Sequence, residues 1–478
     1  MMQYDALIHG FRRSLRALVF LVILAGLCQQ QAGESMAQEA PPSTSMQGNI
    51  FGGMGNYWLS QFANPALRGA LYQTPDWPMT GYYPIYPGAN LPVLSDDGVR
   101  LGPINVHPLM GVAQMYTDNV FRTRAKAGDF FTTISPGMQG QLPFAGRHVF
   151  VVDYRTNLQF YQQHSSNNVQ DQTGAARFKL DFPGGLKLDL GGEHKIGHDP
   201  RGTAVDTRAF GINKWQADSM IGQAVFDGAQ SSIRLNLQST RWRYLHRTGQ
   251  DIIQNRLTNY AGMTLSRNLS PKTSLLANVG ATQQIYEDNK NLDSVVYQFS
   301  GGVKWDISEL TSGQILVGVQ QLRFSRAQID QPPPVLNRFT RGADSFTNFF
   351  VMGNLVWVPT PFLTVILQPY RTVQQTAALT SLFFVSTGAN LAVSQQVTDS
   401  TTVTLNLGIE QDKFTSASGA TTGVDRTDLL KNVAIGAKYR AVKWLGVGVQ
   451  YIYENRTSTQ DAFEYNANTM MVSAETLF

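Results

Sequence analysis

The sequence places one compact group of potential metal ligands at Glu193, His194, His198 and Asp199. Histidine and carboxylate side chains at short spacing are the donors that zinc sites use. The group falls where a predicted strand runs into a long polar connection that contains glycine and proline. We therefore interpret it as part of a solvated loop, and we expect no metal and no cofactor.

Motifs for other chemistry are absent from the sequence. It contains no P-loop, no G-x-G-x-x-G after a strand, no C-x-x-C and no EF-hand loop. A Ser/His/acid set at the rim of a barrel would remain as a route to hydrolysis, but the histidines at positions 107, 148, 164, 194 and 246 form no constellation along the chain. We predict that the protein is not an enzyme.

Most charged side chains occur instead at every second position of apolar stretches. Residues 150–160 show the pattern, because Asp153 and Arg155 alternate with large apolar side chains. Successive side chains of a strand point to opposite faces, so one face of each stretch is apolar and the other is polar. The polar faces define the predicted lumen-lining residues, which are Asp153, Arg155, Arg177, Lys179, Asp181, Lys187, Asp189, Glu193, Lys304, Asp306, Glu410, Asp412, Lys438 and Arg440.

These predicted inward charges have both signs on neighbouring strands. One interpretation is that they pair across strands and line a watered interior. The other is that they form a polar track that passes a hydrophilic or anionic solute. The sequence leaves both interpretations open.

The elements that position these residues are β-hairpins. The hairpin at 432–454 is the clearest, and the same unit recurs through the chain. A mean hydropathy of -0.18 excludes a bundle of transmembrane helices, whereas the strands of a barrel are apolar only at alternate positions. We predict an all-β fold, a transmembrane antiparallel up-and-down β-barrel. About eighteen strands are predicted, at 104–119, 129–141, 148–163, 172–182, 186–196, 217–226, 231–245, 255–267, 273–286, 294–307, 313–326, 345–358, 362–375, 384–397, 401–414, 429–440, 445–455 and 466–478.

The connections alternate between short and long. Short turns such as 183–185 and 359–361 alternate with long polar loops such as 197–216 and 327–344. Outer-membrane barrels have short periplasmic turns and longer extracellular loops. A soluble β-sandwich has no reason to keep that asymmetry, so the pattern favours the bacterial outer membrane.

Three segments are predicted. Residues 1–37 resemble a secretory signal peptide, with three arginines, an apolar core and an A-x-A-like end. Residues 38–103 are rich in Pro, Gly and Tyr, and form either a disordered periplasmic extension or a plug for the barrel. Residues 104–478 are the barrel. The single cysteine, Cys28, raises a lipoprotein alternative, but Leu27 precedes it where such a cleavage site requires a small residue.

The expected partners follow from this location. Lipid and lipopolysaccharide of the outer membrane would cover the apolar face. The final strand ends in Phe478, which resembles the signal that the barrel-assembly machinery recognises. A net charge of +4 is spread along the chain rather than clustered, so no nucleic-acid partner is expected.

Two predicted strands break the alternation. Near Ile233 the apolar face switches before Trp242 and Tyr244, and near Ile315 it switches around Gln320. A β-bulge would restore each pattern. For the first strand, the alternative is that Arg241 and its neighbours lie above the membrane and meet anionic head groups.

Several motifs resemble one family. Residues 116–123 (Tyr-Thr-Asp-Asn-Val-Phe-Arg-Thr), Ser135-Pro136-Gly137, Tyr154 and residues 199–202 (Asp-Pro-Arg-Gly) resemble the opening of the family called putative β-barrel porin 2. The resemblance implies an outer-membrane barrel, and an association with capsule or exopolysaccharide production. It brings no catalytic residues.

Three functions follow as expectations. The first is a conduit for export of exopolysaccharide or capsular polysaccharide, fed by periplasmic export components. The second is a general or solute-selective diffusion porin, because barrels of 16–18 strands leave an aqueous channel. The third is a structural or adhesive barrel plugged by residues 38–103.

Overall fold

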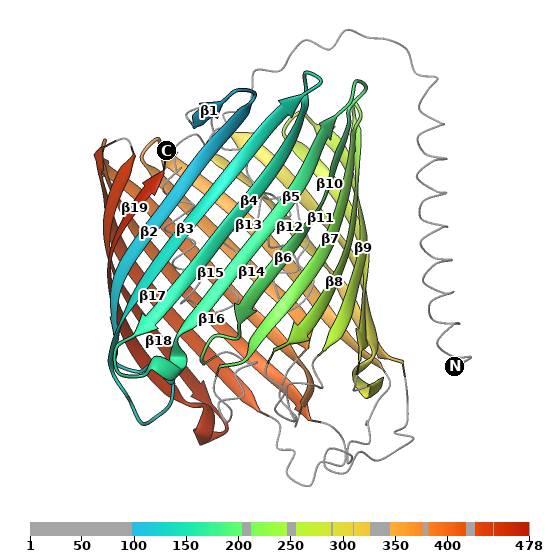
Figure 1. Cartoon of the computed structure of the whole chain (residues 1–478). Coiled ribbons are helices and arrows are strands. Elements are labelled where there is room, and N and C mark those ends of the chain that lie inside the picture. Colours follow the sequence, from blue (N-terminus) through green and yellow to red (C-terminus); the bar gives the residue numbers. More distant parts are fainter. Residues whose placement is uncertain are drawn as a thin grey trace. The chain divides into compact units, whose positions relative to one another are not determined.

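The computed structural model describes residues 98–202, 212–245, 255–287, 290–308, 310–325, 345–375, 381–416, 426–442 and 444–477. Within these ranges eighteen antiparallel strands, β2 to β19, pair in chain order. β19 also pairs with β2, so the sheet closes into a barrel (Figure 1). A three-residue strand, β1, adds only to β2. The eighteen-stranded barrel that the sequence predicts is thereby confirmed, whereas the expected signal peptide and residues 38–97 lie outside the described residues.

The strands match the predicted spans to within a few residues at most ends. Their bounds are β1 (Val99–Leu101), β2 (Ile104–Thr117), β3 (Asp129–Phe144), β4 (His148–Tyr161), β5 (Val169–Asp181), β6 (Leu186–His198), β7 (Lys214–Asp227), β8 (Ser231–Tyr244), β9 (Arg256–Ser270), β10 (Thr273–Tyr286), β11 (Ser294–Ser308), β12 (Thr311–Phe324), β13 (Ser345–Thr360), β14 (Leu363–Gln375), β15 (Ser381–Thr398), β16 (Thr401–Ser416), β17 (Thr427–Val442), β18 (Leu445–Ser458) and β19 (Tyr465–Leu477). Three short 3₁₀ helices occur at η1 (Ser165–Asn167), η3 (Lys290–Leu292) and η4 (Asp461–Phe463). No helix in the described ranges is long and apolar enough to cross a membrane.

Burial alternates along the strands as the sequence pattern predicts. On β4, Val152 and Tyr154 are 43% and 47% exposed, whereas Asp153 between them is 2% exposed. Large apolar side chains therefore point out of the barrel and polar ones point in, which is the reverse of a soluble protein. This arrangement suits a bilayer, where lipid solvates the outer face and the backbone bonds are satisfied around the closed sheet.

The turns at one end of the barrel are tight. Gly146 is the central residue of the β3–β4 turn, and Gly184 and Gly185 lie in the β5–β6 turn, all three with positive φ. Trp357 and Tyr439 lie near turns at this same end and are 52% and 51% exposed, as an interfacial aromatic girdle requires. We take this end as periplasmic and the opposite end, which carries the longer connections, as extracellular.

Neither of the suspected bulges is present in the described strands. β8 keeps a continuous register against β7 and β9, and β12 keeps one against β13. At the extracellular end of β8, Trp242 points inward and is 4% exposed, while Arg241 points outward and forms a 2.8 Å ion pair with Glu287. The bulge interpretation is therefore wrong. In β8 the apolar face switches because Trp242 and Tyr244 lie on the inward face at the extracellular end of the strand. This end lies beyond the band of outward apolar side chains.

Candidate functional site

The inward faces of β3 and β4 carry a tightly bonded polar group. Arg155 Nε lies 2.9 Å from Asp153 Oδ1, and Gln139 Nε2 donates to Asp153 Oδ2 at 3.2 Å. Asp153 and Gln139 are almost fully buried. Two of the predicted lumen-lining charges are thus brought together as a pair on one strand.

The neighbouring strands β5 and β6 carry a second group of predicted charges. Arg177 Nη1 and Lys179 Nζ contact the two oxygens of Asp189 at 3.2 and 3.3 Å. Arg177 is 1% exposed, and Glu193, also on β6, is 5% exposed. Two cations of β5 thus share the carboxylate of Asp189, and the buried Glu193 lies further along β6.

Four other predicted residues lie toward the periplasmic end. Asp181 ends β5, and Lys187 on β6 lies 3.5 Å from Asp227 of β7, with both side chains about half exposed. Lys304 on β11 is exposed. The backbone of Asp306 belongs to β11, but its side chain is outside the described part of the structure.

Two predicted cations lie on β17. Lys438 forms an ion pair with Glu475 of β19, reaching across the intervening strand β18. Arg440 is exposed, and its Nη2 donates to the main-chain carbonyl of Asp399 in the β15–β16 turn at 2.8 Å. Arg440 therefore ties two periplasmic turns together at the rim.

The last two predicted residues, Glu410 and Asp412, lie on the inward face of β16. Glu410 is 7% exposed and Asp412 is 2% exposed. The hydroxyl of Tyr370, from β14, donates to Glu410 Oε2. These carboxylates are thus held in a buried polar group next to a tyrosine.

The possible metal ligands of residues 193–199 do not converge on one point. Three of the four are bonded to different neighbours: His194 Nδ1 lies 2.6 Å from Asp218 Oδ1, His198 Nδ1 lies 2.9 Å from Asp171 Oδ1, and Asp199 Oδ1 accepts from Trp215 Nε1 at 3.0 Å. Among the described residues, no group of three or more His, Cys, Asp or Glu side chains could hold a metal ion.

A contiguous row of side-chain amides lies on the inward faces of β10 to β12. Gln298 Nε2 donates to Asn278 Oδ1 at 3.1 Å, and Gln320 Nε2 donates to Gln298 Oε1 at 3.0 Å. Asn348 on β13 is the direct cross-strand neighbour of Gln320. The three amides Asn278, Gln298 and Gln320 are at most 2% exposed. Amides both donate and accept, so this sector of the wall is polar without charge.

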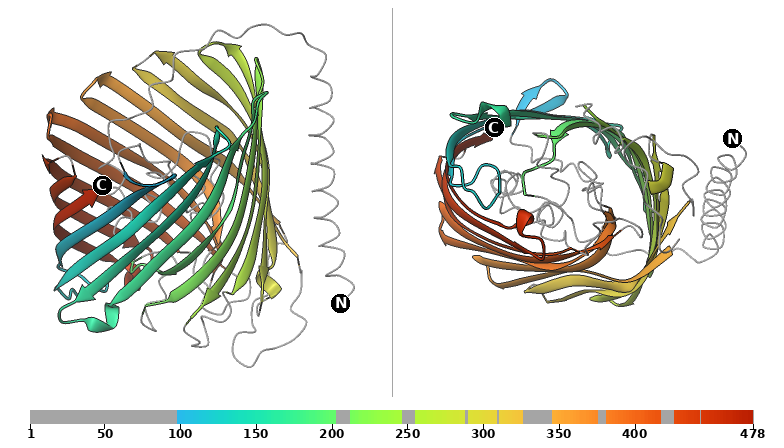
Figure 2. Two further views of the ribbon diagram at one scale, coloured as in Figure 1. Left: turned by 45° about the horizontal axis from the view of Figure 1, so that its top comes forward. Right: turned by 90° about the horizontal axis from the view of Figure 1, so that it is seen from below.

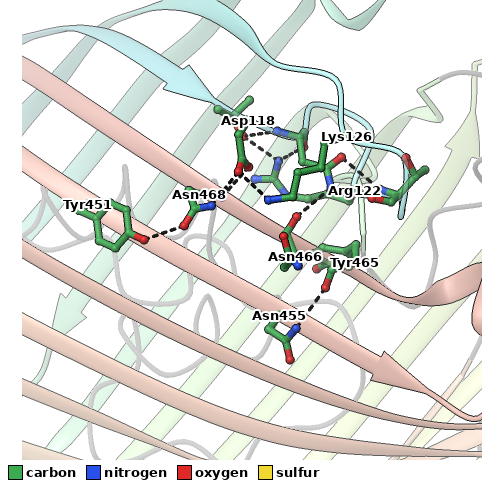
Figure 3. Close-up of polar contacts among 11 residues, drawn as sticks. Asp118, Arg122, Lys126, Tyr451, Asn455, Tyr465, Asn466 and Asn468 are labelled. Carbon is green, nitrogen blue, oxygen red and sulfur yellow. Dashed lines mark hydrogen bonds and ion pairs between the residues drawn. The ribbon is translucent and has the colours of Figure 1, made fainter.

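A second feature joins the chain segments at the extracellular end, and we call it the extracellular clasp. It consists of the connection 118–128 after β2, the turn 199–202 after β6, and the facing ends of β17, β18 and β19. Asp118 accepts from the backbone N and from Nδ2 of Asn468 at 2.8 and 2.7 Å, and from Lys126 Nζ at 2.7 Å (Figure 3). The connection after β2 is thereby fixed to the last strand.

Asn119 and Arg122 complete this half of the clasp. Asn119 Nδ2 donates to the carbonyls of Thr123 and Asn466 at 2.7 and 2.8 Å, so its side chain makes the turn, as we expect of Asx residues. Arg122 adopts a φ of 52°. Its Nη2 contacts Glu454 Oε2 of β18 at 2.6 Å, with both side chains about nine-tenths buried.

The turn 199–202 forms the other half. The carbonyl of Gly202 accepts from Arg456 Nη1 at 2.9 Å and from the hydroxyl of Tyr465 at 3.4 Å. Gly202 has a φ of 77°, and a Cβ placed on it would lie 2.8 Å from the Tyr465 hydroxyl and 3.0 Å from Arg122 Cβ. Both the backbone conformation and the lack of space therefore require glycine at position 202. Arg456 also pairs with Asp428, which is fully buried.

This contact carries the turn across the interior. Five strands (β19, β2, β3, β4 and β5) separate β18 from β6 in the sheet. At about 4.8 Å per strand the two are roughly 29 Å apart along the wall, so the turn reaches Arg456 by crossing the lumen rather than by following the wall. The end-on view shows the segment after β6 leaving the wall toward the interior (Figure 2, right).

The clasp also sets the charge states of two of its members. Burial raises the pKa of the Asp118 carboxyl, but the hydrogen bonds from Lys126 and Asn468 outweigh burial and leave the pKa below its ordinary value. For Arg122, burial lowers the pKa, and the adjacent Glu454 carboxylate together with two nearby tyrosines raises it by more. Asp118 and Arg122 are therefore both charged at neutral pH.

Pattern reasoning missed Arg122, Gly202, Glu454 and Arg456 as a group. The signal was present in part, because residues 116–123 and 199–202 were the segments that carry the family resemblance. The sequence pattern did not indicate that these two segments contact each other and β18.

Most of the chain matches one known protein family. The family model described as Putative beta-barrel porin 2 matches residues 92–477. No curated protein matches the chain.

Solved outer-membrane structures align with much of the chain at low identity. OccAB3 of Acinetobacter baumannii is 10% identical, with a TM-score of 0.43, covering 78% of this chain and 99% of its own. OpdL of Pseudomonas aeruginosa is 11% identical, with a TM-score of 0.45, covering 78% and 98%. The FrpB iron transporter of Neisseria meningitidis is 9% identical, with a TM-score of 0.44, covering 74% and 62%.

Proposed function

The chain belongs to the family described as Putative beta-barrel porin 2, and on this premise we propose that it is a passive conduit that exports exopolysaccharide or capsular polysaccharide. Its location is the bacterial outer membrane, and the family indicates a channel rather than an enzyme. The polymer, the predicted lumen-lining residues and the periplasmic export partners are parts of this proposal.

One observation carries the proposal. The inward face combines ion-paired groups, such as Arg177 with Asp189, and a row of uncharged amides from Asn278 to Gln320. These side chains are almost fully buried and are bonded to one another. A wall whose polar groups are already paired binds a passing hydroxyl-rich polymer only weakly, which suits a passive conduit.

Deletion of the gene provides the test. An export conduit predicts that polysaccharide accumulates in the periplasm while the uptake of small solutes is unchanged. Reduced uptake with normal surface polysaccharide would overturn the proposal. As a control, the deletion strain is complemented with the intact chain, which should restore surface polysaccharide.

The second candidate is a diffusion porin, favoured by the width that eighteen strands allow. It predicts the reverse phenotype, namely slow uptake of hydrophilic solutes and normal polysaccharide. The third candidate is a plugged structural or adhesive barrel. Robust single-channel conductance of the whole mature protein in planar bilayers would exclude it.

A further inference from the structure

The barrel wall is incomplete between β13 and β14. Their register pairs begin at Thr360 with Leu363 next to the turn and end at Val351 with Arg371. The pairing is also interrupted opposite Pro369, which has no N–H to donate. The extracellular ends of the two strands therefore continue without register pairs, and we call this break the β13–β14 seam.

The two sides of the seam overlap instead of meeting edge to edge. Leu322 and Phe346 belong to the inward series of β12 and β13, whereas Val373 and Phe383 belong to the outward series of β14 and β15. Yet Leu322, Val373 and Phe383 share one buried apolar cluster with Val385, and the rings of Phe346 and Phe383 are 4.7 Å apart. An inner face can touch an outer face only if the ends of β12 and β13 lie outside β14 and β15.

This overlap explains the second switch of apolar face in the sequence. Gln320 faces the interior, whereas Leu322, two residues further along the same inward series, packs on the outer surface of the next strands. An apolar residue is required there because the inward face of β12 is covered by protein and not by water.

Two side chains bridge the seam. Arg371 Nη2 of β14 donates to Asn348 Oδ1 of β13 at 3.2 Å, and Gln320 provides the second link. Gln320 Oε1 accepts from the backbone N of Val373 at 3.0 Å and from Thr372 Oγ1 at 3.2 Å. Gln320 comes from β12, so it reaches past β13 to supply an acceptor that a carbonyl of β13 would supply in a continuous ladder. It is 1% exposed.

The seam is continuous with the lipid-facing surface. Val317, Val319 and Phe349, on the outer faces of β12 and β13, are 45%, 46% and 56% exposed. At its extracellular end the space between the two layers is lined by aliphatic and aromatic side chains, which interact favourably with hydrocarbon. Further in, Arg371 bonds to Asn348 and Thr387.

We propose that the β13–β14 seam is a lateral opening of the wall, held closed by Gln320 and by the Arg371–Asn348 bond, and that acyl chains of outer-leaflet lipid enter between its layers at the extracellular end. When the seam opens, the lumen becomes continuous with the bilayer at this one place. The proposal concerns the wall, so it stands whether polymer or small solutes pass along the lumen.

The test is photo-crosslinking of the full chain in native outer membranes. p-Benzoylphenylalanine is placed at Phe383, between the layers, and irradiation is followed by mass analysis for lipid adducts. Phe349 is the positive control because it is exposed to lipid. Phe384, the next residue, is the negative control because it points inward and stacks on Phe414 at 4.8 Å. Lipid adducts at Phe383 are expected, and bonds to protein alone, as at Phe384, would overturn the proposal.

A matched pair of variants tests the bridge. Gln320→Ala is expected to raise lipid adducts at Phe383 by about five- to tenfold, the change that one lost net hydrogen bond makes in an equilibrium. Gln298→Ala removes the same side chain from the adjacent strand β11, where Gln298 bonds to Asn278 of β10 and Gln320 of β12. An equal increase in both variants, or none in Gln320→Ala, would overturn the assignment of Gln320. Heat-modified migration on gels confirms that each variant folds.

Discussion

The closing pair β2–β19 and the internal pair β13–β14 show two ways to join neighbouring strands. The closing pair brings together residues 350 positions apart, Asp118 and Asn468, and has nine register pairs. The internal pair is joined by a short turn and has only six. A turn brings strand ends together at little entropic cost, whereas closure of a whole chain requires contacts of its own.

The closing pair and the internal pair, which we call the two junctions, also differ in the kind of interaction that holds them. Charge-assisted bonds from Asn468 to Asp118 fix the closing pair in one register, because they are short and directional. The internal pair is held at its extracellular end by apolar packing, by Gln320 and by the Arg371–Asn348 bond. Apolar packing is non-directional and tolerates sliding. The strongest constraint therefore lies at the ends of the chain, and the weakest lies in its middle.

The largest expected effect breaks the ion pair that ties the connection after β2 to β18, beside the closing pair. Glu454→Gln leaves Arg122 buried without its carboxylate, and removal of one partner of a buried ion pair costs about 3–5 kcal/mol. We expect a loss of that size in the free energy of unfolding, measured by urea titration in detergent micelles. Glu464→Gln is the matched control, since its partner Arg124 is largely exposed, and it should cause no measurable loss. Equal losses would show that Glu454 does not act through burial.

The next effect undocks the turn from the clasp. Gly202→Ala combines strain at positive φ, about 1–2 kcal/mol, with a contact to the Tyr465 hydroxyl. Gly146→Ala is the matched control, because Gly146 has a φ of 83° and nothing within 4 Å of an added Cβ. We expect Gly202→Ala alone to raise single-channel conductance, because the turn then leaves the lumen. Unchanged conductance would show that the turn does not restrict the channel.

The third effect sharpens the description of the internal pair. A continuous ladder would place Phe350 opposite Thr372, because Val351 pairs with Arg371. The double variant Phe350→Cys/Thr372→Cys should form little disulfide, whereas Met352→Cys/Tyr370→Cys, which are register partners, should form it readily. Cys28 is the only native cysteine, so the background is low. Efficient cross-linking of the first pair would show that the ladder closes.

The sequence predicts the strands well because their pattern is local. The strand predicted at 273–286 matches β10, which alternates cleanly and follows a turn containing proline. The start of β7 was missed by three residues, since Lys214 to Gln216 lie where Trp215 faces inward and reverses the usual pattern. Period-two alternation identifies strands and faces, and it fails where the face no longer contacts lipid.

The two junctions were beyond such reasoning for a physical reason. Gly202 and Arg456 meet across the interior, and neither position has an unusual neighbour in sequence. Likewise, Gln320 and Leu322 both occupy inward positions in the alternation of β12. Yet Gln320 bridges the seam, whereas Leu322 packs on the outer surface of the next strands. Which face a strand end covers depends on tertiary overlap, and alternation along one strand carries no information on it.

The smallest expected effect is on the pH dependence of the closing pair. The pKa of Asp118 is lower in the folded protein than in the unfolded chain, so the unfolded state binds the proton first as the pH falls. Asp118 therefore contributes stability at pH values above its unfolded pKa, about 3.9, and that contribution is lost as the pH falls through the folded pKa. Asp118→Asn should be less stable than the native chain at pH 6 and equal to it at the lowest pH. Unfolding titrations of both proteins across this range provide the measurement, and parallel pH profiles would show that the bonds from Lys126 and Asn468 do not depend on the charge of Asp118.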